Sequence, residues 1–414
     1  MLDGLGFYHV RQQPQHSTIT THEGQNELEQ DMIAEKNSDK GSPYVGSASQ
    51  EPPLYYAIES VPYDLDRGGS LLGRLQIMRL VSALMAGLTA LFVFFFLRES
   101  LPGVPAASTM GALGVALMPL LGFMSGSVNP DSLLYAVCAA VFYLLARAFR
   151  RGLSTRGAVA LGTAIAIGLL TKLNFVGVLP GVLLGILLLT IRARRAHGRS
   201  AYRLPAMALA IGLAPVVLYA AAKLLGGHSP FGVVSGALHP AHGFLAELNY
   251  IWQLYLPRIP GTVNDFPSLF PARQLWFNYS VGLYGWLDTT FPAWVYNAAL
   301  LPAGAILVLF CRAAYKDRAA LRHRVAELSV YAAMTLGLMG LVGAGSYRSF
   351  PEFNAEFSEP RYFLPLLALF GAVLAMAIRG AGKRWGPVVG TLLVVLILAH
   401  DIFSQLQVVA RFYG

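Results

Sequence analysis

Ten apolar runs, each close to the length of a membrane span, fill the chain after residue 70. A transmembrane helix needs roughly 20 apolar residues to cross a bilayer core of about 30 Å. Of the 414 residues, 55% are hydrophobic and only 13% are charged, as expected for a membrane protein. The sequence predicts an all-α, polytopic transmembrane bundle of about ten helices, at about 76–97, 104–124, 130–147, 157–172, 174–191, 205–225, 292–311, 326–345, 361–378 and 386–407.

The basic residues follow every second run, and the intervening loops carry few of them. The positive-inside rule therefore places the basic loops in the cytoplasm. The net charge of +9 marks this orientation, with help from anionic headgroups, and does not indicate nucleic acid as a partner. The basic residues concerned are Arg98, Arg147, Arg150, Arg151, Arg156, Arg192, Arg194, Arg195, Arg199, Arg203, Arg312, Lys316, Arg318, Arg322, Arg324, Arg379, Lys383 and Arg384.

This alternation places residues 1–75 outside the cytoplasm, yet no apolar signal region lies ahead of the first run. We therefore expect a further helix upstream of Met1. On this interpretation residues 1–70 are the remnant of a first extracytoplasmic loop, and residues 71–414 form the bundle.

The largest outer loop, residues 226–291, is rich in aromatic residues, Pro and Gly. Loops this long are usually functional or disordered, and the aromatic content argues against disorder. The loop is predicted to form a lid or interfacial layer with Trp252, Tyr255, Trp276 and Trp286 at headgroup level. An aromatic belt with no substrate role is the alternative.

Two outer helix ends carry charged residues. In "SVNPDSLL", Asn129 is a candidate N-cap, Pro130 the first helical residue and Asp131 an acid in the first turn. These are ordinary start signals, but Asp131 is also placed to act as a base, a metal ligand or an acceptor for hydroxyl groups. In "LLTKLN", Lys172 lies at a helix C-terminus, where a cation suits the dipole and can reach water.

A third outer end, "SEPRYFLP", has Pro360 at the first helical position and Arg361 directly after it. A cation in the first turn is disfavoured by up to about 1 kcal/mol, so something should compensate it. Glu359 as an ion pair and a bound phosphate are the two candidates, and the planar guanidinium suits phosphate well.

Other patterns point to packing rather than chemistry. "GFMSG" (122–126) and "GVLLG" (181–185) have the small-xxx-small spacing of closely packed membrane helices. Cys138 and Cys311 fall at different depths and predict neither a disulfide nor a metal site. No nucleotide-binding glycine loop, zinc-type cluster or nucleophile elbow is present in the sequence.

Six segments occur in the order typical of one family: "EPPLYY", "MRLVSALMAGLTALF", "NPDSLL", "LLTKLNFVGVLP", "GLYGWLD" and "EPRYFLP". Over roughly residues 50–370 the chain resembles bacterial predicted membrane proteins of unassigned function. That family in turn resembles the GT-C glycosyltransferases, which include protein O-mannosyltransferases and lipid A aminoarabinose transferases. The order of the segments, rather than any single motif, carries this resemblance.

The resemblance implies an enzyme of the bacterial plasma membrane that transfers a sugar from a polyprenyl-phosphate carrier to an extracytoplasmic acceptor. Arg361 and Lys172 would hold the phosphate, and Asp131 would be a candidate base. Tyr362 and Asp288 would join them in binding substrate. Tyr55 and Tyr56 would sit at the headgroup boundary on a backbone that Pro52 and Pro53 keep extended. A divalent metal cofactor is left open.

One departure and two alternatives accompany this interpretation. Relatives begin with a helix followed by an acidic pair and a histidine, whereas "THEGQNE" (21–27) has the wrong order, so the main catalytic acid is expected upstream of Met1. A carrier or flippase for a lipid-linked saccharide would need polar residues along a path to the cytoplasmic leaflet, and the inner halves of the runs are nearly free of them. A non-catalytic membrane subunit is the other alternative.

Overall fold

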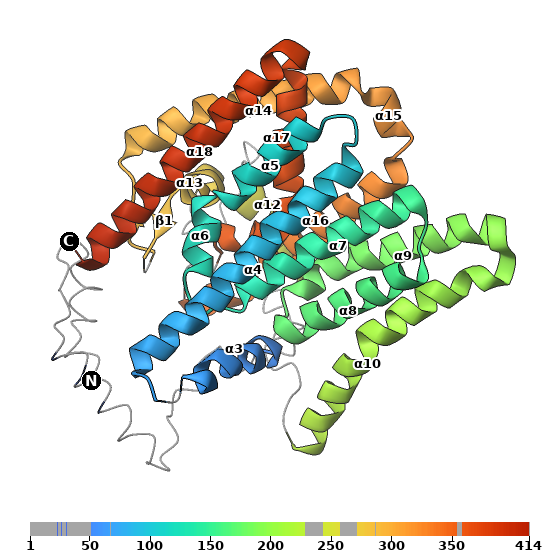
Figure 1. Cartoon of the computed structure of the whole chain (residues 1–414), viewed down its shortest axis with the longest axis horizontal. Coiled ribbons are helices and arrows are strands. Elements are labelled where there is room, and N and C mark those ends of the chain that lie inside the picture. Colours follow the sequence, from blue (N-terminus) through green and yellow to red (C-terminus); the bar gives the residue numbers. More distant parts are fainter. Residues whose placement is uncertain are drawn as a thin grey trace.

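The computed structural model describes residues 51–66, 68–227, 243–256, 271–285, 287–353 and 358–413, together with positions 23, 26 and 30. Over these residues the fold is a helical bundle with one two-stranded hairpin (Figure 1). In chain order the elements are α3 (Leu54–Leu65), α4 (Leu71–Ser100), α5 (Pro105–Ala116), α6 (Pro119–Ser125), α7 (Asp131–Arg151), α8 (Thr155–Thr171), α9 (Phe175–His197), η2 (Gly198–Tyr202), α10 (Arg203–Leu225), α12 (Phe244–Tyr255), η3 (Arg273–Asn278), α13 (Tyr279–Val281), β1 (Leu283–Tyr284), β2 (Thr289–Thr290), α14 (Ala293–Lys316), α15 (Arg318–Arg322), α16 (Val325–Phe353), η4 (Pro360–Leu366), α17 (Leu367–Gly380) and α18 (Gly382–Tyr413).

All ten predicted runs are helical, but the number of spans is smaller than ten. Within the described residues eight helices are long and apolar enough to cross a membrane, or nine if α5 and α6 form one bent span. The bend of 51° falls where Pro119 forces the preceding Met118 into an extended conformation. The remaining run is α8, whose 17 residues reach about 25 Å at 1.5 Å per residue.

Helix α7 lies inside the bundle, between α4 and α8 (Figure 1). Of the most apolar 18 residues of α7, 72% are buried, against 6% for α14 and 11% for α18. The outer helices therefore leave most of their apolar surface for lipid, whereas α7 is enclosed by protein. Small residues allow the close contacts: a Cβ on Gly181 of α9 would lie 2.5 Å from the backbone nitrogen of Met334 on α16. This confirms the packing interpretation of "GVLLG".

The helix ends that carry the basic residues gather at one end of the bundle, the basic end. There Glu99, at the end of α4, forms ion pairs with Arg150 and Arg151, at the end of α7. Arg324, ahead of α16, donates to the carbonyl of Ser100 at 2.7 Å. The opposite end, which we call the site end, holds the start of α7, the end of α8 and the start of η4. The helices thus alternate in direction as the charge pattern predicts.

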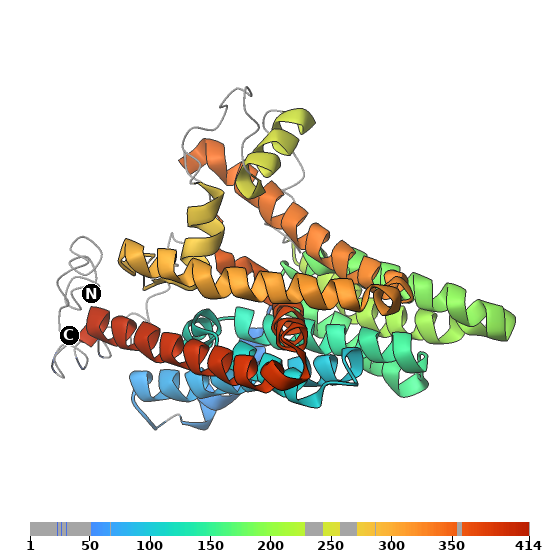
Figure 2. The same ribbon diagram turned by 90° about the horizontal axis from the view of Figure 1, so that it is seen from above.

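Two segments at the site end are more structured than expected. "PPLYY" is not extended: Pro53 is in the helical region, and α3 starts directly after it and packs beside α4 and α8. Prolines suit the start of a helix as well as an extended segment, which explains the error. In the loop 226–291 the described parts form α12, η3, α13 and the hairpin. Figure 2 shows α12 beside the end of α16, where Tyr250 and Ser346 share a hydrogen bond of 2.7 Å.

Candidate functional site

Asp131 and Lys172 form a buried ion pair at the site end. Asp131 opens α7, and its backbone N–H donates to Oδ1 of Asn129 at 3.0 Å. The N-cap position belongs to Pro130 rather than to Asn129, so the predicted start of this helix is wrong by one residue. Lys172 follows α8 in an extended conformation, and its Nζ lies 2.8 Å from Oδ1 of Asp131. The side chain of Asp131 is only 3% exposed, and that of Lys172 is 13% exposed. Oδ2 of Asp131 has no hydrogen-bond partner among the described residues.

Arg361 and Glu359 form a second pair. Pro360 opens η4 as predicted, and the Nε of Arg361 lies 2.8 Å from Oε2 of Glu359 while Nη2 donates to Oε1 at 3.2 Å. Glu359 therefore provides the compensation that a cation at this helix start requires. Tyr135 of α7 donates to the backbone carbonyl of Arg361 at 3.3 Å, and the ring of Tyr362 lies 5.3 Å from the guanidinium carbon. These contacts hold η4 against α7.

The two pairs influence one another, and a fifth residue joins them. Burial raises the pKa of Glu359; Arg361 and Lys172 oppose this rise, and Asp131 adds to it. The fifth residue is Glu51, whose Oε2 accepts from the backbone N–H of Leu173 at 3.4 Å. Burial raises its pKa as well, with Lys172 opposing and Asp131 adding. We call these five residues the charge cluster: Glu51, Asp131, Lys172, Glu359 and Arg361.

Sequence reasoning brought three members of the charge cluster forward as site residues and considered Glu359 only as a local partner. It missed Glu51. The available signal was the position of Glu51 directly ahead of the "PPLYY" segment. Nothing in the local sequence shows that this position returns to the break between α8 and α9.

Tyr55 and Tyr56 both pack at the site end, but in different surroundings. Tyr55 is fully buried, and its hydroxyl shares a hydrogen bond of 2.7 Å with Ser82 of α4. Ser82 in turn donates to Oε1 of the buried Glu59 at 3.0 Å. Tyr55 is therefore enclosed by protein and contacts α4, and its placement at the headgroup boundary stays a prediction. Tyr56 is half-buried, and Glu51 and Asp131 add to the rise that burial causes in its pKa.

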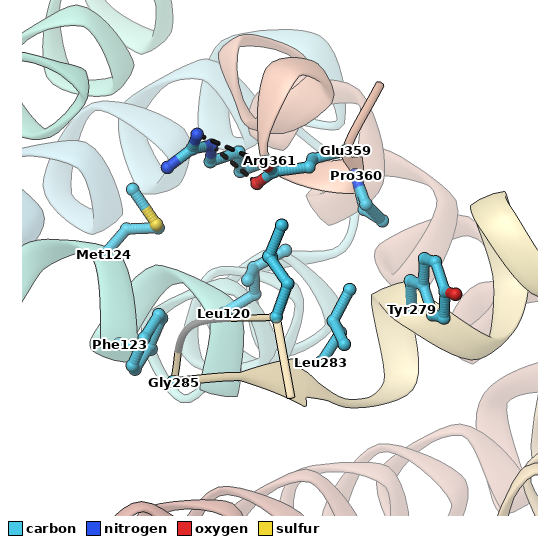
Figure 3. Close-up of a pocket in the computed structure, with 10 residues that line it drawn as sticks. Leu120, Phe123, Met124, Tyr279, Leu283, Gly285, Glu359, Pro360 and Arg361 are labelled. Carbon is cyan, nitrogen blue, oxygen red and sulfur yellow. Dashed lines mark hydrogen bonds and ion pairs between the residues drawn. The ribbon is translucent and has the colours of Figure 1, made fainter. Parts of the chain in front are cut away.

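A cavity of about 360 Å³ lies beside the Glu359–Arg361 pair (Figure 3). Among the described residues that line it, only Glu359 and Arg361 are charged. Figure 3 shows the pair on one side, with residues of α6 and of the hairpin across the space from it. The other lining residues are Leu120, Phe123, Met124, Tyr279, Leu283, Gly285, Leu287 and Pro360.

An apolar groove of about 310 Å³ adjoins this cavity, because Leu120 and Pro360 line both. Most of its wall comes from η4 and α17, including Phe363, Leu366 and Leu367. Phe370, which is 38% exposed, lies at its outer side and opens it to the surface of the bundle. The cavity with its charged pair and the apolar groove thus meet at the start of η4.

Asp288 stands apart from the charge cluster. Its Oδ2 accepts from Nη2 of Arg411 on α18 at 2.8 Å, and both side chains are largely buried. The pair attaches the hairpin to the last helix, and Leu287 beside it lines the cavity. Asp288 itself does not line the cavity as described, and its carboxylate is engaged by Arg411.

The aromatic residues of the outer loop divide into two groups. Tyr255 and Trp276 stack at 5.1 Å between ring centroids, and both contact Phe363 of η4. Trp252 is exposed, as an interfacial residue would be, and Trp286 lies outside the described residues. Part of the loop thus packs against the element that carries Arg361.

Within the described part of the chain, no three His, Cys, Asp or Glu side chains converge in a way that could hold a metal ion. The chain was also compared with known proteins. A family model described as "Predicted membrane protein (DUF2142)" matches residues 16–370, which include the whole charge cluster. No curated protein and no solved structure matches the chain.

Proposed function

This chain belongs to the DUF2142 family of predicted membrane proteins, and for it we propose the activity of a GT-C-like membrane glycosyltransferase. The donor is a sugar on a polyprenyl phosphate, and the acceptor is a hydroxyl group on the extracytoplasmic face of the bacterial plasma membrane. One observation carries the proposal: Glu359 and Arg361 of the charge cluster line a cavity that adjoins an apolar groove, at the end opposite the basic loops.

The donor side of the proposal rests on Arg361 and the groove. A lipid-linked phosphate needs a cationic site for its head and an apolar surface for its chain. Arg361 faces the cavity, and its planar guanidinium has donors beyond those turned toward Glu359. The groove beside it would take the first isoprene units. Lys172 supplies a second positive charge in the same cluster.

The acceptor side rests on Asp131. In the proposed reaction the acceptor oxygen bonds to the anomeric carbon while the bond from that carbon to the phosphate oxygen breaks. The proton of the hydroxyl passes to Oδ2 of Asp131, the oxygen without a hydrogen-bond partner among the described residues. Polyprenyl phosphate leaves with the electron pair, and Arg361 and Lys172 stabilise its negative charge.

The test is transfer of label from polyprenyl-phosphate sugars in membranes that contain the chain. Arg361→Gln should lower the rate by about 100-fold, as expected for removal of a group that stabilises developing charge. Arg379→Gln is the matched control, since Arg379 lies on α17 at the basic end, paired with Asp317. Full activity in Arg361→Gln would refute the phosphate role, and Asp131→Asn tests the base in the same assay.

The same preparation separates the enzyme from its alternatives. A carrier would move the labelled lipid between leaflets without transferring sugar to an acceptor. A non-catalytic subunit would do neither on its own. Movement without transfer, abolished by Arg361→Gln, would replace the proposal with the carrier.

A further inference from the structure

A second recess lies at the basic end, and we propose that it binds the phosphate headgroup of one anionic glycerophospholipid. This site is independent of the proposed transfer reaction. Arg147, in its lining, is 16 residues along α7 from Asp131, or about 24 Å at 1.5 Å per residue. The two sites therefore lie near opposite membrane surfaces.

The recess has a volume of about 460 Å³ and is formed by the end of α7 and the start of α8. Its lining combines an apolar wall with two cations, Arg147 and Arg156. None of the described residues that line it is acidic. The remaining lining residues are Leu144, Ala148, Gly152, Leu153, Ser154, Gly157 and Ala160.

The two arginines differ from their neighbours in having no carboxylate partner among the described residues. Arg150 and Arg151, on the same helix, are both paired with Glu99. Arg147 instead donates to the hydroxyl of Tyr143 at 2.7 Å. Two exposed positive charges beside one recess attract an anion, and the walls beside them suit the first carbons of an acyl chain.

The length of α8 explains why a lipid rather than a soluble anion fits this recess. At about 25 Å, α8 is shorter than a hydrocarbon core of about 30 Å. The start of α8, which lines the recess, therefore need not reach the headgroup plane. A headgroup at this end of α8 would lie near Arg147 and Arg156, which both line the recess. Arginine side chains near a helix end extend toward headgroups in this way.

The test uses purified full-length chain in phosphatidylcholine nanodiscs with and without phosphatidylglycerol. Native mass spectrometry then counts the phosphatidylglycerol molecules that remain bound after delipidation. Arg147→Gln/Arg156→Gln should weaken retention by about 25-fold, about fivefold for each arginine. The control Arg195→Gln/Arg199→Gln removes the same charge from exposed positions at the same end and should retain the lipid.

A second variant tests the recess without changing charge. Ala160→Phe fills the wall while keeping both arginines, and it should also lose the lipid. Retention in both this variant and the Arg147/Arg156 variant would overturn the site. Equal loss in the Arg195/Arg199 control would show that only overall charge matters and would overturn it too. Displacement of the lipid by inorganic phosphate alone would identify a soluble-anion site instead and would refute the proposal.

Discussion

Lys172 and Asp131 show why a buried ion pair is sensitive to the loss of one partner. Lys172→Met leaves Asp131 buried without its cation, and we expect a loss of about 3 kcal/mol in the free energy of unfolding. Arg379→Met breaks the more exposed pair with Asp317 and should cost about 1 kcal/mol or less. Denaturation in detergent measures both. Equal losses would show that burial does not distinguish the pairs.

The burial of Glu59 predicts how the stability of the fold depends on pH. Burial raises its pKa above the ordinary value of 4.5, and hydrogen bonds from Ser82 and Tyr55 offset this only in part. As pH rises past 4.5 the unfolded chain loses this proton first, so the folded state is progressively destabilised up to its own, higher pKa. Glu59→Gln should therefore melt above wild type at neutral pH.

The difference between Glu59→Gln and wild type should shrink as pH falls and should vanish below about 4.5, where the carboxyl is protonated in both states. Thermal melts across pH provide the measurement. Ser60→Ala, a change at an exposed neighbour on α3, should melt in parallel with wild type. A constant difference across pH would exclude ionisation of Glu59 as the cause.

Among the helices, the contact between α9 and α16 depends on Gly181. A Cβ there would lie 2.5 Å from the nitrogen of Met334 and 2.6 Å from the carbonyl oxygen of Val330, and backbone atoms cannot move aside singly. Gly181→Ala should destabilise the fold by about 1–3 kcal/mol, as overpacking does. Gly340→Ala on α16 has open space and should be neutral or slightly stabilising. Equal effects in unfolding experiments would contradict the tight contact.

The sequence also set a limit on what could be predicted for individual elements. Long apolar runs locate membrane helices because the bilayer imposes their length and composition. The same criterion cannot show that α5 and α6 bend at Pro119, or that α3 is helical. Nor does it show the hairpin, whose strands have two residues each and are held by Tyr284, Phe291 and the Asp288–Arg411 pair. Such features depend on contacts between distant segments.

Over the whole molecule, the charge pattern predicts which end faces the cytoplasm. With Cys311→Ser as background and Cys138 buried, single cysteines at Arg150 and Arg195 should react with an impermeant maleimide only after cells are permeabilised. A cysteine at Ser60 on α3 should react in intact cells. Labelling of the Arg150 and Arg195 positions from outside would reverse the orientation and remove the basis for an extracytoplasmic site.

The candidate site was predictable in part for a reason that concerns the whole chain. Because successive membrane helices alternate in direction, the sequence assigned Asp131, Lys172 and Arg361 to one membrane side, and the structure brings them together there. Direction alone could not pair Lys172 with Asp131 or add Glu51, because such pairings depend on which helices become neighbours. It also could not separate Tyr55, which is buried against α4, from Tyr56, whose pKa is raised by burial and further by Glu51 and Asp131.

The apolar groove opens at Phe370, and this affects how the fraction of protein with ligand bound in the groove should be measured. A ligand that enters through a wall facing lipid comes from the surrounding leaflet, so its supply is set by its mole fraction in the membrane rather than by its amount per volume of water. Diluting the vesicles with buffer should leave saturation unchanged, whereas diluting the ligand with inert phospholipid should lower it.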